Sequence, residues 1–319
     1  GPKQAAHSLA IIEVCRDLQR RYPTPDGDVL IELAVASTAY FTGQWSLAVQ
    51  HCVVFLRLYQ EANSRMQWEL RSIQYFGLCA LLYRGELGEL AERVPAYRRE
   101  ARDRGDLYFG TNLDVGETSV HWLVLDKPEE ARRNVHEAME RWSKGTVQVQ
   151  HWYALQSLAQ VDLYTGEVEG TLARVERELP AIRRSFLLRV QHTRIKAIWL
   201  RARCALAAGG LHLAKAEQDA RALEREGAAW AAAVAKLVRA GVHACRGDRG
   251  QAQAELRTAI DQLEQTEMPM LAATARRALG LVLGGEEGER LVSEADVWLR
   301  SRGVVDPARF ARVFATGCF

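Results

Sequence analysis

The sequence predicts an all-α fold, a right-handed solenoid of about seven stacked antiparallel helical hairpins. A turn residue, followed five positions later by Ala in four of six cases, recurs at intervals of 42, 41, 40, 43 and 38 residues: Gly43, Gly85, Asp126, Gly166, Gly209 and Gly247. Residues seven positions before each turn are mostly small, and those three positions before are nearly all apolar. A period near 40 is typical of a repeat array, because each hairpin exposes apolar faces that only its neighbours can bury.

Composition sets limits on the fold and on the location. The chain has 319 residues, of which 48% are hydrophobic, 26% are charged and only 8 are proline. These values exclude a disordered or collagen-like chain. No run of eighteen apolar residues is present, so we expect no membrane span. We expect an elongated array without a central core, located in the cytoplasm.

The first residues indicate an excised fragment. Gly1-Pro2 is typical of a cleaved expression tag, so residues 1–2 are interpreted as its remnant. Residues 3–27 contain an amphipathic helix that ends at a segment rich in proline. This helix lies one period before the second helix of the next hairpin. We therefore expect it to complete a truncated repeat within a longer protein.

Residues 28–303 are predicted to form the repeats. The first helices of the hairpins are apolar around much of their circumference and should form a buried inner layer, at 28–42, 67–84, 107–125, 147–165, 187–208 and 229–246. The second helices, for example 128–142, 211–226 and 250–264, are apolar on one face and should form a solvated outer layer. Small residues at the fixed offsets let the paired helices approach closely.

The end of the array is predicted at residues 304–319. A seventh hairpin spans 268–302, and Asp306-Pro307 then provides an N-cap and a first-turn proline for a short helix that ends near Phe314. A repeat array needs an atypical terminal segment to cover its last apolar face. We expect residues 304–319 to be that C-terminal cap.

Enzyme and cofactor motifs are not found in the sequence. There is no GxxxxGK[ST] phosphate loop, no GxGxxG after a strand, no HExxH and no nucleophile elbow. The cysteines are scattered without CxxC spacing, which favours reduced thiols, at positions 15, 52, 79, 204, 245 and 318. We therefore expect no catalytic residue, no metal site and no cofactor, and we predict that the protein is not an enzyme.

The turn Gly43-Gln44-Trp45-Ser46-Leu47-Ala48, a Gly-x-aromatic-x-x-Ala pattern, resembles that of tetratricopeptide repeats, although the period is near 40 and not about 34. The bias of 36 Arg to 6 Lys and the ending ADVWLRSRGVVDPAR at 295–309 are similar to long, degenerate repeats at the C-terminus of bacterial signal-transduction ATPases and Ser/Thr kinase proteins. The resemblance implies a regulatory, ligand-sensing or scaffold arm with a concave protein-interaction groove.

A basic stretch marks a candidate partner site. Residues 181–203 carry seven Arg and Lys residues and no acidic residue. A seven-residue spacing places Arg189, Lys196 and Arg203 on one stripe of the first helix of the fifth hairpin, with His192 between them. In tetratricopeptide repeats these offsets from the turn face the concave groove. Neighbouring repeats place further polar residues at the corresponding offsets, namely Tyr153, Ser157, Gln160 and Glu117.

Two interpretations of this stretch remain open. Arginine's planar fork suits carboxylate and phosphate groups, so the groove could bind an acidic peptide, a phosphorylated segment or a nucleotide. Alternatively, the arginines pair with Glu169, Glu176 or Glu178 and otherwise face water. Nucleic acid is not favoured, because the net charge is only +2 and no helix-turn-helix pattern is present.

The sequence thus predicts a non-enzymatic solenoid that binds a peptide or protein in its concave groove. It would be the regulatory arm of a larger bacterial signalling protein with an ATPase or kinase upstream, and binding would bias those upstream domains. Two alternatives stay open: a constitutive scaffold or oligomerisation arm without a ligand, and a sensor of a nucleotide or another small effector.

Overall fold

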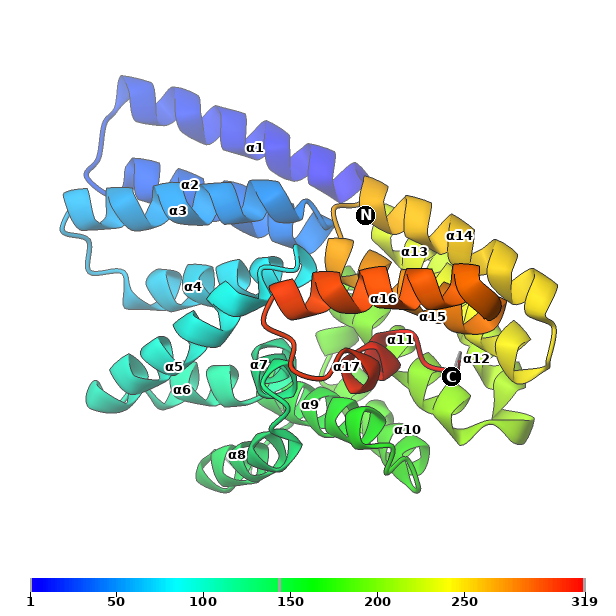
Figure 1. Cartoon of the computed structure of the whole chain (residues 1–319). Helices are drawn as coiled ribbons and strands as arrows, with labels where there is room; N and C mark the ends of the chain where they lie inside the picture. Colours follow the sequence, from blue (N-terminus) through cyan, green and yellow to red (C-terminus); the bar gives the residue numbers. More distant parts are fainter. Residues whose placement is uncertain (1, 143–144, 318–319) are drawn as a thin grey trace.

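The computed structural model describes residues 2–142 and 145–317, with side chains from residue 5 onward. Within these ranges the chain forms seventeen α-helices and three short 3-10 helices, and no strand (Figure 1). The predicted all-α solenoid of helical hairpins is therefore confirmed.

The helices form seven consecutive hairpins after a leading helix, α1 (Pro2–Arg21). The first helices of the hairpins are α2 (Gly27–Thr42), α4 (Gln67–Tyr83), α6 (Leu107–Asp114) continued by η1 (Gly116–Ser119) and α7 (Val120–Val124), α9 (Val149–Thr165), α11 (Gln191–Ala208), α13 (Ala229–Cys245) and α15 (Pro269–Leu283). The second helices are α3 (Trp45–Glu61), α5 (Leu87–Asp103), α8 (Pro128–Arg141), α10 (Thr171–Arg184), α12 (Leu213–Arg225), α14 (Arg249–Gln265) and α16 (Gly285–Ser301). The remaining elements are η2 (Leu187–Arg189), η3 (Gly210–His212) and a final helix, α17 (Pro307–Phe314).

The recurring turn ends a first helix in a left-handed residue. At Gly43, φ is 82°, and its N–H donates to the Tyr40 carbonyl at 3.2 Å while the Gln44 N–H donates to Ala39 at 2.9 Å. This arrangement satisfies carbonyls that the helix leaves free, and glycine adopts it without a Cβ penalty. Asp126 has φ 54° at the equivalent turn. The repeat spacing read from the sequence therefore marks real helix ends.

The two kinds of helix bury different amounts of their surface. In first helices, the small residues seven positions before the turn are fully buried, as at Ala36, Ala159, Ala202 and Ala240. A second helix such as α8 buries only one stripe, Ala131, Val135 and Ala138. This difference separates a buried inner layer from a half-solvated outer layer, as the periodicity indicates.

The first helix of the third hairpin is broken, whereas a continuous helix was expected over 107–125. Val115 is extended, with φ −122° and ψ 167°, and Gly116 is left-handed, with φ 71°. The Thr118 hydroxyl donates to the Asn112 carbonyl at 3.0 Å, which satisfies a carbonyl at the end of α6. A Cβ at position 116 would lie 2.8 Å from the ring of Tyr153. We call the surface that the first helices turn toward the interior of the array the inner wall. The break places Glu117 on this wall, where it is buried.

The array is not open. Trp45 in α3 and Trp230 in α13 lie with their rings 6.0 Å apart, and Arg302 after α16 forms an ion pair with Glu86 before α5 at 2.8 Å. One continuous cluster of buried apolar residues extends from residue 39 to residue 315. The expectation of an elongated array without a central core is therefore wrong. The first hairpin meets the sixth, the second meets the end of the seventh, and the inner helices share one core (Figure 1).

The final helix α17 lies inside this closed superhelix. It contacts α15 and α16 of the last hairpin, and it also contacts α9, three hairpins earlier (Figure 1). Its buried residues form one apolar face: Pro307, Phe310, Ala311, Val313 and Phe314. The helix thus covers more than the end of the array.

The thiols are free wherever the structure describes them. Cys15 and Cys245 are exposed, and the other three, Cys52, Cys79 and Cys204, are buried. Cys318 and Gly1 lie outside the described residues. Across residues 2–142 and 145–317, no three His, Cys, Asp or Glu side chains gather closely enough to hold a metal ion. In the same ranges, no helix combines the length and apolar character that crossing a membrane requires.

Candidate functional site

An ion pair lies at the centre of the inner wall. Lys196 of α11 pairs with Glu117 of η1, and both side chains are buried. The Lys196 ammonium also donates to the Tyr40 hydroxyl at 3.1 Å, and that hydroxyl donates to Glu117 Oε1 at 3.2 Å. Three inner segments from the first, third and fifth hairpins therefore converge on one polar cluster. The sequence predicted that Lys196 and Glu117 face inward. It did not predict that they form an ion pair with each other.

Neutral hydroxyls and a thiol surround the pair. Burial raises the pKa of Tyr40, Tyr83 and Cys79, and the charge of Glu117 adds to the rise in each case. Lys196 Nζ lies 5.3 Å from the ring centre of Tyr40 and 5.5 Å from that of Tyr83. The ammonium is thus held by one carboxylate and two aromatic faces.

His192 lies one helical turn before Lys196 in an aromatic box. Its ring centre is 4.7 Å from that of Tyr40, 5.4 Å from Trp230 and 6.0 Å from Trp45. Neither ring nitrogen has a hydrogen-bond partner among the described residues. Burial, reinforced by Lys196, lowers the pKa of His192 well below its ordinary value, so the imidazole is neutral.

The α9 residues continue the inner wall. Ser157 donates to the Gly116 carbonyl at 3.1 Å and also contacts the Ser119 hydroxyl. The Tyr153 ring lies 5.5 Å from that of Tyr75 in α4. Gln160 is buried, and its Oε1 has no partner in the described part of the chain. These residues therefore line the same interior as Lys196.

Arg203 contacts the final helix. The residue is only 2% exposed, and its guanidinium donates to the Val313 carbonyl of α17 at 2.7 Å. It also lies 4.3 Å from the Trp199 ring and 5.7 Å from the Phe314 ring. Burial lowers the pKa of Arg203 to about 10. The third residue of the predicted stripe therefore binds the protein's own C-terminal segment.

Arg189 is not on the inner wall. The expected helix from residue 187 begins only at Gln191, because Phe186 is left-handed, with φ 65°, and Val190 is extended. Arg189 therefore ends η2 and is exposed, with its guanidinium 4.3 Å from the Phe186 ring. The predicted stripe of three cations on one helix is wrong at this residue.

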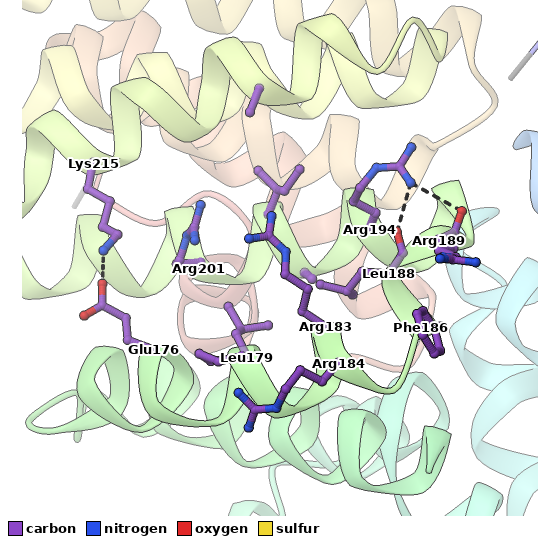
Figure 2. A pocket seen from close by; sticks show the side chains of 14 residues that line it. Glu176, Leu179, Arg183, Arg184, Phe186, Leu188, Arg189, Arg194, Arg201 and Lys215 are labelled. Carbon is purple, nitrogen blue, oxygen red and sulfur yellow. Dashed lines mark hydrogen bonds and ion pairs between the residues drawn. The ribbon is translucent and has the colours of Figure 1, made fainter. Parts of the chain in front are cut away.

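The other basic residues of 181–203 line a groove on the outer side. This groove lies between α10, α11 and α12 and has a volume of about 980 Å³. Figure 2 shows the side chains that line it. Its cationic lining residues are Arg183, Arg184, Arg189, Arg194, Arg201 and Lys215. The basic stretch is thus divided between two sites: Lys196 and Arg203 face inward, and the remaining arginines face the outer groove.

Two features of the inner wall escaped the sequence-based prediction. Tyr40 occupies the offset where most repeats have Leu or Ala, and its hydroxyl was the available sign of a polar role. The inward position of α17 had a weaker sign, the apolar face formed by Phe310, Val313 and Phe314 on a very short helix.

Comparison with solved structures identifies a similar fold. The chain resembles the crystal structure of a Rap protein complexed with Competence and Sporulation Factor, with a TM-score of 0.57 and 14% sequence identity, over 89% of this chain and 77% of that chain. Comparison of the sequence with known protein families and with curated proteins finds no match. The similarity identifies the fold as a helical-repeat fold.

Proposed function

We propose that this chain is a regulatory solenoid that binds a peptide segment of a partner along its inner wall, and that α17 occupies this site when no partner is bound. The observation that carries the proposal is the position of α17 against successive inner helices. It contacts α9 and α15 directly, and Arg203 of α11 donates to its backbone. In α13, Cys245 Sγ lies 3.4 Å from the Gly317 carbonyl just beyond α17.

The contacts that hold α17 are of the kind that hold a bound peptide. Arg203 donates to a main-chain carbonyl, which any sequence offers, while Trp199 packs against Phe314 with ring centres 6.2 Å apart. At the other end, Arg309 forms an ion pair with Asp126 at 2.6 Å. An apolar helix face laid into a groove, with charges fixing its register, is a common mode of peptide recognition.

The inner wall also has unused hydrogen-bonding capacity. Glu117 Oε2, Gln160 Oε1 and both nitrogens of His192 have no partner in the described structure. Unpaired buried polar atoms are costly, and they are rare away from sites that a ligand or water completes. A partner segment that reaches these atoms would gain hydrogen bonds that α17 does not form. The inner-wall residues of the proposed site are Glu117, Tyr153, Ser157, Gln160, His192, Lys196 and Arg203.

The structural similarity supports the same use of the fold. The Rap protein, which has a similar fold, was solved in complex with Competence and Sporulation Factor. We propose that the present chain likewise binds a peptide or protein partner and acts as the sensor arm of a larger bacterial signalling protein in the cytoplasm. Binding that displaces α17 would favour one arrangement of the superhelix and so bias domains upstream.

The proposal is tested by emptying the site in the full chain. Phe310→Glu with Phe314→Glu places two carboxylates on the buried face of α17, and we expect this double variant to release the helix while the hairpins stay folded. A fluorescein-labelled peptide with the sequence of residues 304–317 serves as the probe. Fluorescence anisotropy should show binding to the double variant and much weaker binding to the unaltered chain, because tethering gives α17 an effective concentration in the millimolar range.

Matched measurements give the result its meaning. Adding Arg203→Met to the double variant removes the donor to the Val313 carbonyl and should weaken probe binding about tenfold. The same double variant should also capture partners that the unaltered chain does not. If the folded double variant, checked by circular dichroism, fails to bind the probe, the inner wall is not a peptide site, and a constitutive scaffold is the better account.

A further inference from the structure

A second surface lies on the outer side of the superhelix, between α10, α11 and α12 (Figure 2). Its floor is apolar: Leu179 and Ala197 are buried there, and Leu188 and Ile198 are half-buried. Basic side chains surround the floor, and Glu176 is its one acidic lining residue in the described chain. The space, about 980 Å³, is large enough to receive side chains of a partner segment.

Three of the six basic groups are already neutralised. Arg194 pairs with Glu226 at 2.6 Å, Arg201 donates to Asp219 at 3.0 Å, and Lys215 pairs with Glu176. These pairs fix the walls of the groove, and Glu226 and Asp219 are themselves well buried. The charge of these three residues is therefore not available to a partner.

The other three basic groups have no carboxylate partner. Arg183, Arg184 and Arg189 are exposed, and no ion pair joins them to an acidic residue anywhere in residues 2–142 or 145–317. The alternative expectation, that the basic residues of 181–203 pair with Glu169, Glu176 or Glu178, is wrong. Arg194 and Arg201 pair with Glu226 and Asp219 instead, and Glu176 pairs with Lys215, outside that stretch. An uncompensated charge of about +3 therefore faces the mouth of the groove.

Phe186 supplies a separate indication. Its side chain is 61% exposed, and its backbone is left-handed, with φ 65°. A bulky side chain rarely adopts this conformation, because its Cβ crowds the following carbonyl oxygen. An exposed aromatic ring held by such a turn is not explained by the core, and strained residues of this kind cluster at binding sites. The ring lies beside the groove, stacked under Arg189.

We propose that this outer groove docks an acidic segment of a partner protein, with apolar side chains on the floor and on Phe186, and carboxylates against Arg183, Arg184 and Arg189. Charge complementarity selects the partner, because arginine forks match carboxylates. A protein segment fits better than a nucleic acid, since one exposed ring offers no stacking platform for successive bases. This site lies outside the inner wall, so it is independent of the function proposed above.

The test uses the full chain and a defined probe. The probe is a fluorescein-labelled 14-residue peptide with Leu at every third or fourth position and Glu between, and anisotropy is read at low and at physiological salt. The variant R183E/R184E/R189E should weaken binding about tenfold or more, and binding to the unaltered chain should weaken as salt rises. A peptide with Lys in place of Glu should bind the variant better than the unaltered chain.

A matched control separates the groove from bulk charge. R133E/R246E/R249E also reverses three exposed arginines that have no acidic partner in the described residues, and Arg246 caps a helix C-terminus much as Arg184 ends α10. This control should bind the acidic peptide within about threefold of the unaltered chain. Equal loss in both variants, no binding to the unaltered chain, or tighter binding of an oligothymidylate would each overturn the proposal.

Phe186→Gly provides a second variant that does not depend on charge. Glycine tolerates the left-handed backbone, so the melting temperature should stay the same or rise. Binding of the Leu-Glu peptide should nevertheless weaken several-fold, because an apolar contact is lost. Unchanged binding by this more stable variant would show that the ring has only a local structural role.

Discussion

At the residue scale, the stability of the fold should be most sensitive to mutation of the Lys196–Glu117 ion pair. Both charges are buried, so neither can regain water if its partner is removed. Breaking a buried pair from one side costs about 3–5 kcal/mol, whereas replacing both partners often costs little. Since Tyr40 hydrogen-bonds both members, the pair also joins three hairpins that are distant in sequence.

Lys196→Met should therefore lower the free energy of unfolding by about 3–5 kcal/mol, measured by urea denaturation. The double variant E117Q/K196M should recover most of that loss, because no charge remains buried and the glutamine can still accept from Tyr40. Lys215→Met is the control: its pair with Glu176 is partly solvated, so it should cost less than about 1 kcal/mol. Similar losses of stability at both lysines would mean that burial of the Lys196–Glu117 pair does not raise the cost of breaking it.

The buried histidines predict a pH dependence of stability. Burial lowers the pKa of His121 to about 4 and that of His192 well below 6.5. In the unfolded chain both titrate near 6.5, so between pH 6.5 and about 5 the unfolded state binds more protons than the folded state. As the pH is lowered through that window, the free energy of unfolding should decrease. The decrease approaches about 1.4 kcal/mol per pH unit for each histidine that is protonated in the unfolded chain and neutral in the folded chain. His192→Phe should remove about half of this slope. A flat profile would show that the histidines are solvated.

At the element scale, local chemistry made the helices and turns predictable. Gly43 and its equivalents mark the ends of the first helices, because a left-handed residue ends a helix. This backbone conformation depends on neighbouring residues alone. The break at Val115 and Gly116 was not predicted. Gly116 packs closely against Tyr153 of the next hairpin, a contact that the local sequence does not reveal. Likewise, a continuous helical pattern through Arg189 conceals the left-handed Phe186.

Gly116→Ala tests the origin of the break. Alanine would strain the left-handed backbone and place its Cβ 2.8 Å from the Tyr153 ring. Gly247 is the matched control, with φ 78° and open space around it, so Gly247→Ala should cost only the backbone strain of about 1–2 kcal/mol. We expect Gly116→Ala to cost at least about 1 kcal/mol more in chemical denaturation. Equal costs would show that Tyr153 moves aside freely.

At the scale of the whole molecule, the repeat spacing predicted the stacking but not the closure. Closure depends on contacts such as Trp45 with Trp230 and Glu86 with Arg302, whose members are too far apart in sequence for any periodicity to reveal. The same holds for the candidate site. Offsets from the turns identified Lys196, Glu117 and Ser157 as inward-facing, but the sequence does not indicate that an ion pair and α17 fill that interior.

The proposed exchange of α17 for a partner requires that α17 leave without unfolding the array. A covalently attached helix of eight residues, anchored by one apolar face and by Arg203 and Arg309, can open sub-globally while α9 and α11 keep their own packing. If α17 were instead an inseparable part of the core, no partner could compete with it. Exchange of α17 for a partner therefore requires that α17 be locally less stable than α9 and α11.

Native-state hydrogen exchange of the full chain measures that difference. We expect the amides of α17 to exchange through an opening at least about 2 kcal/mol below the free energy of global unfolding, with a weak dependence on denaturant. Amides of α9 and α11 should exchange only with global unfolding. If the amides of α17 share the protection and the denaturant dependence of α11, the helix is permanent core and the inner wall is not available to a partner.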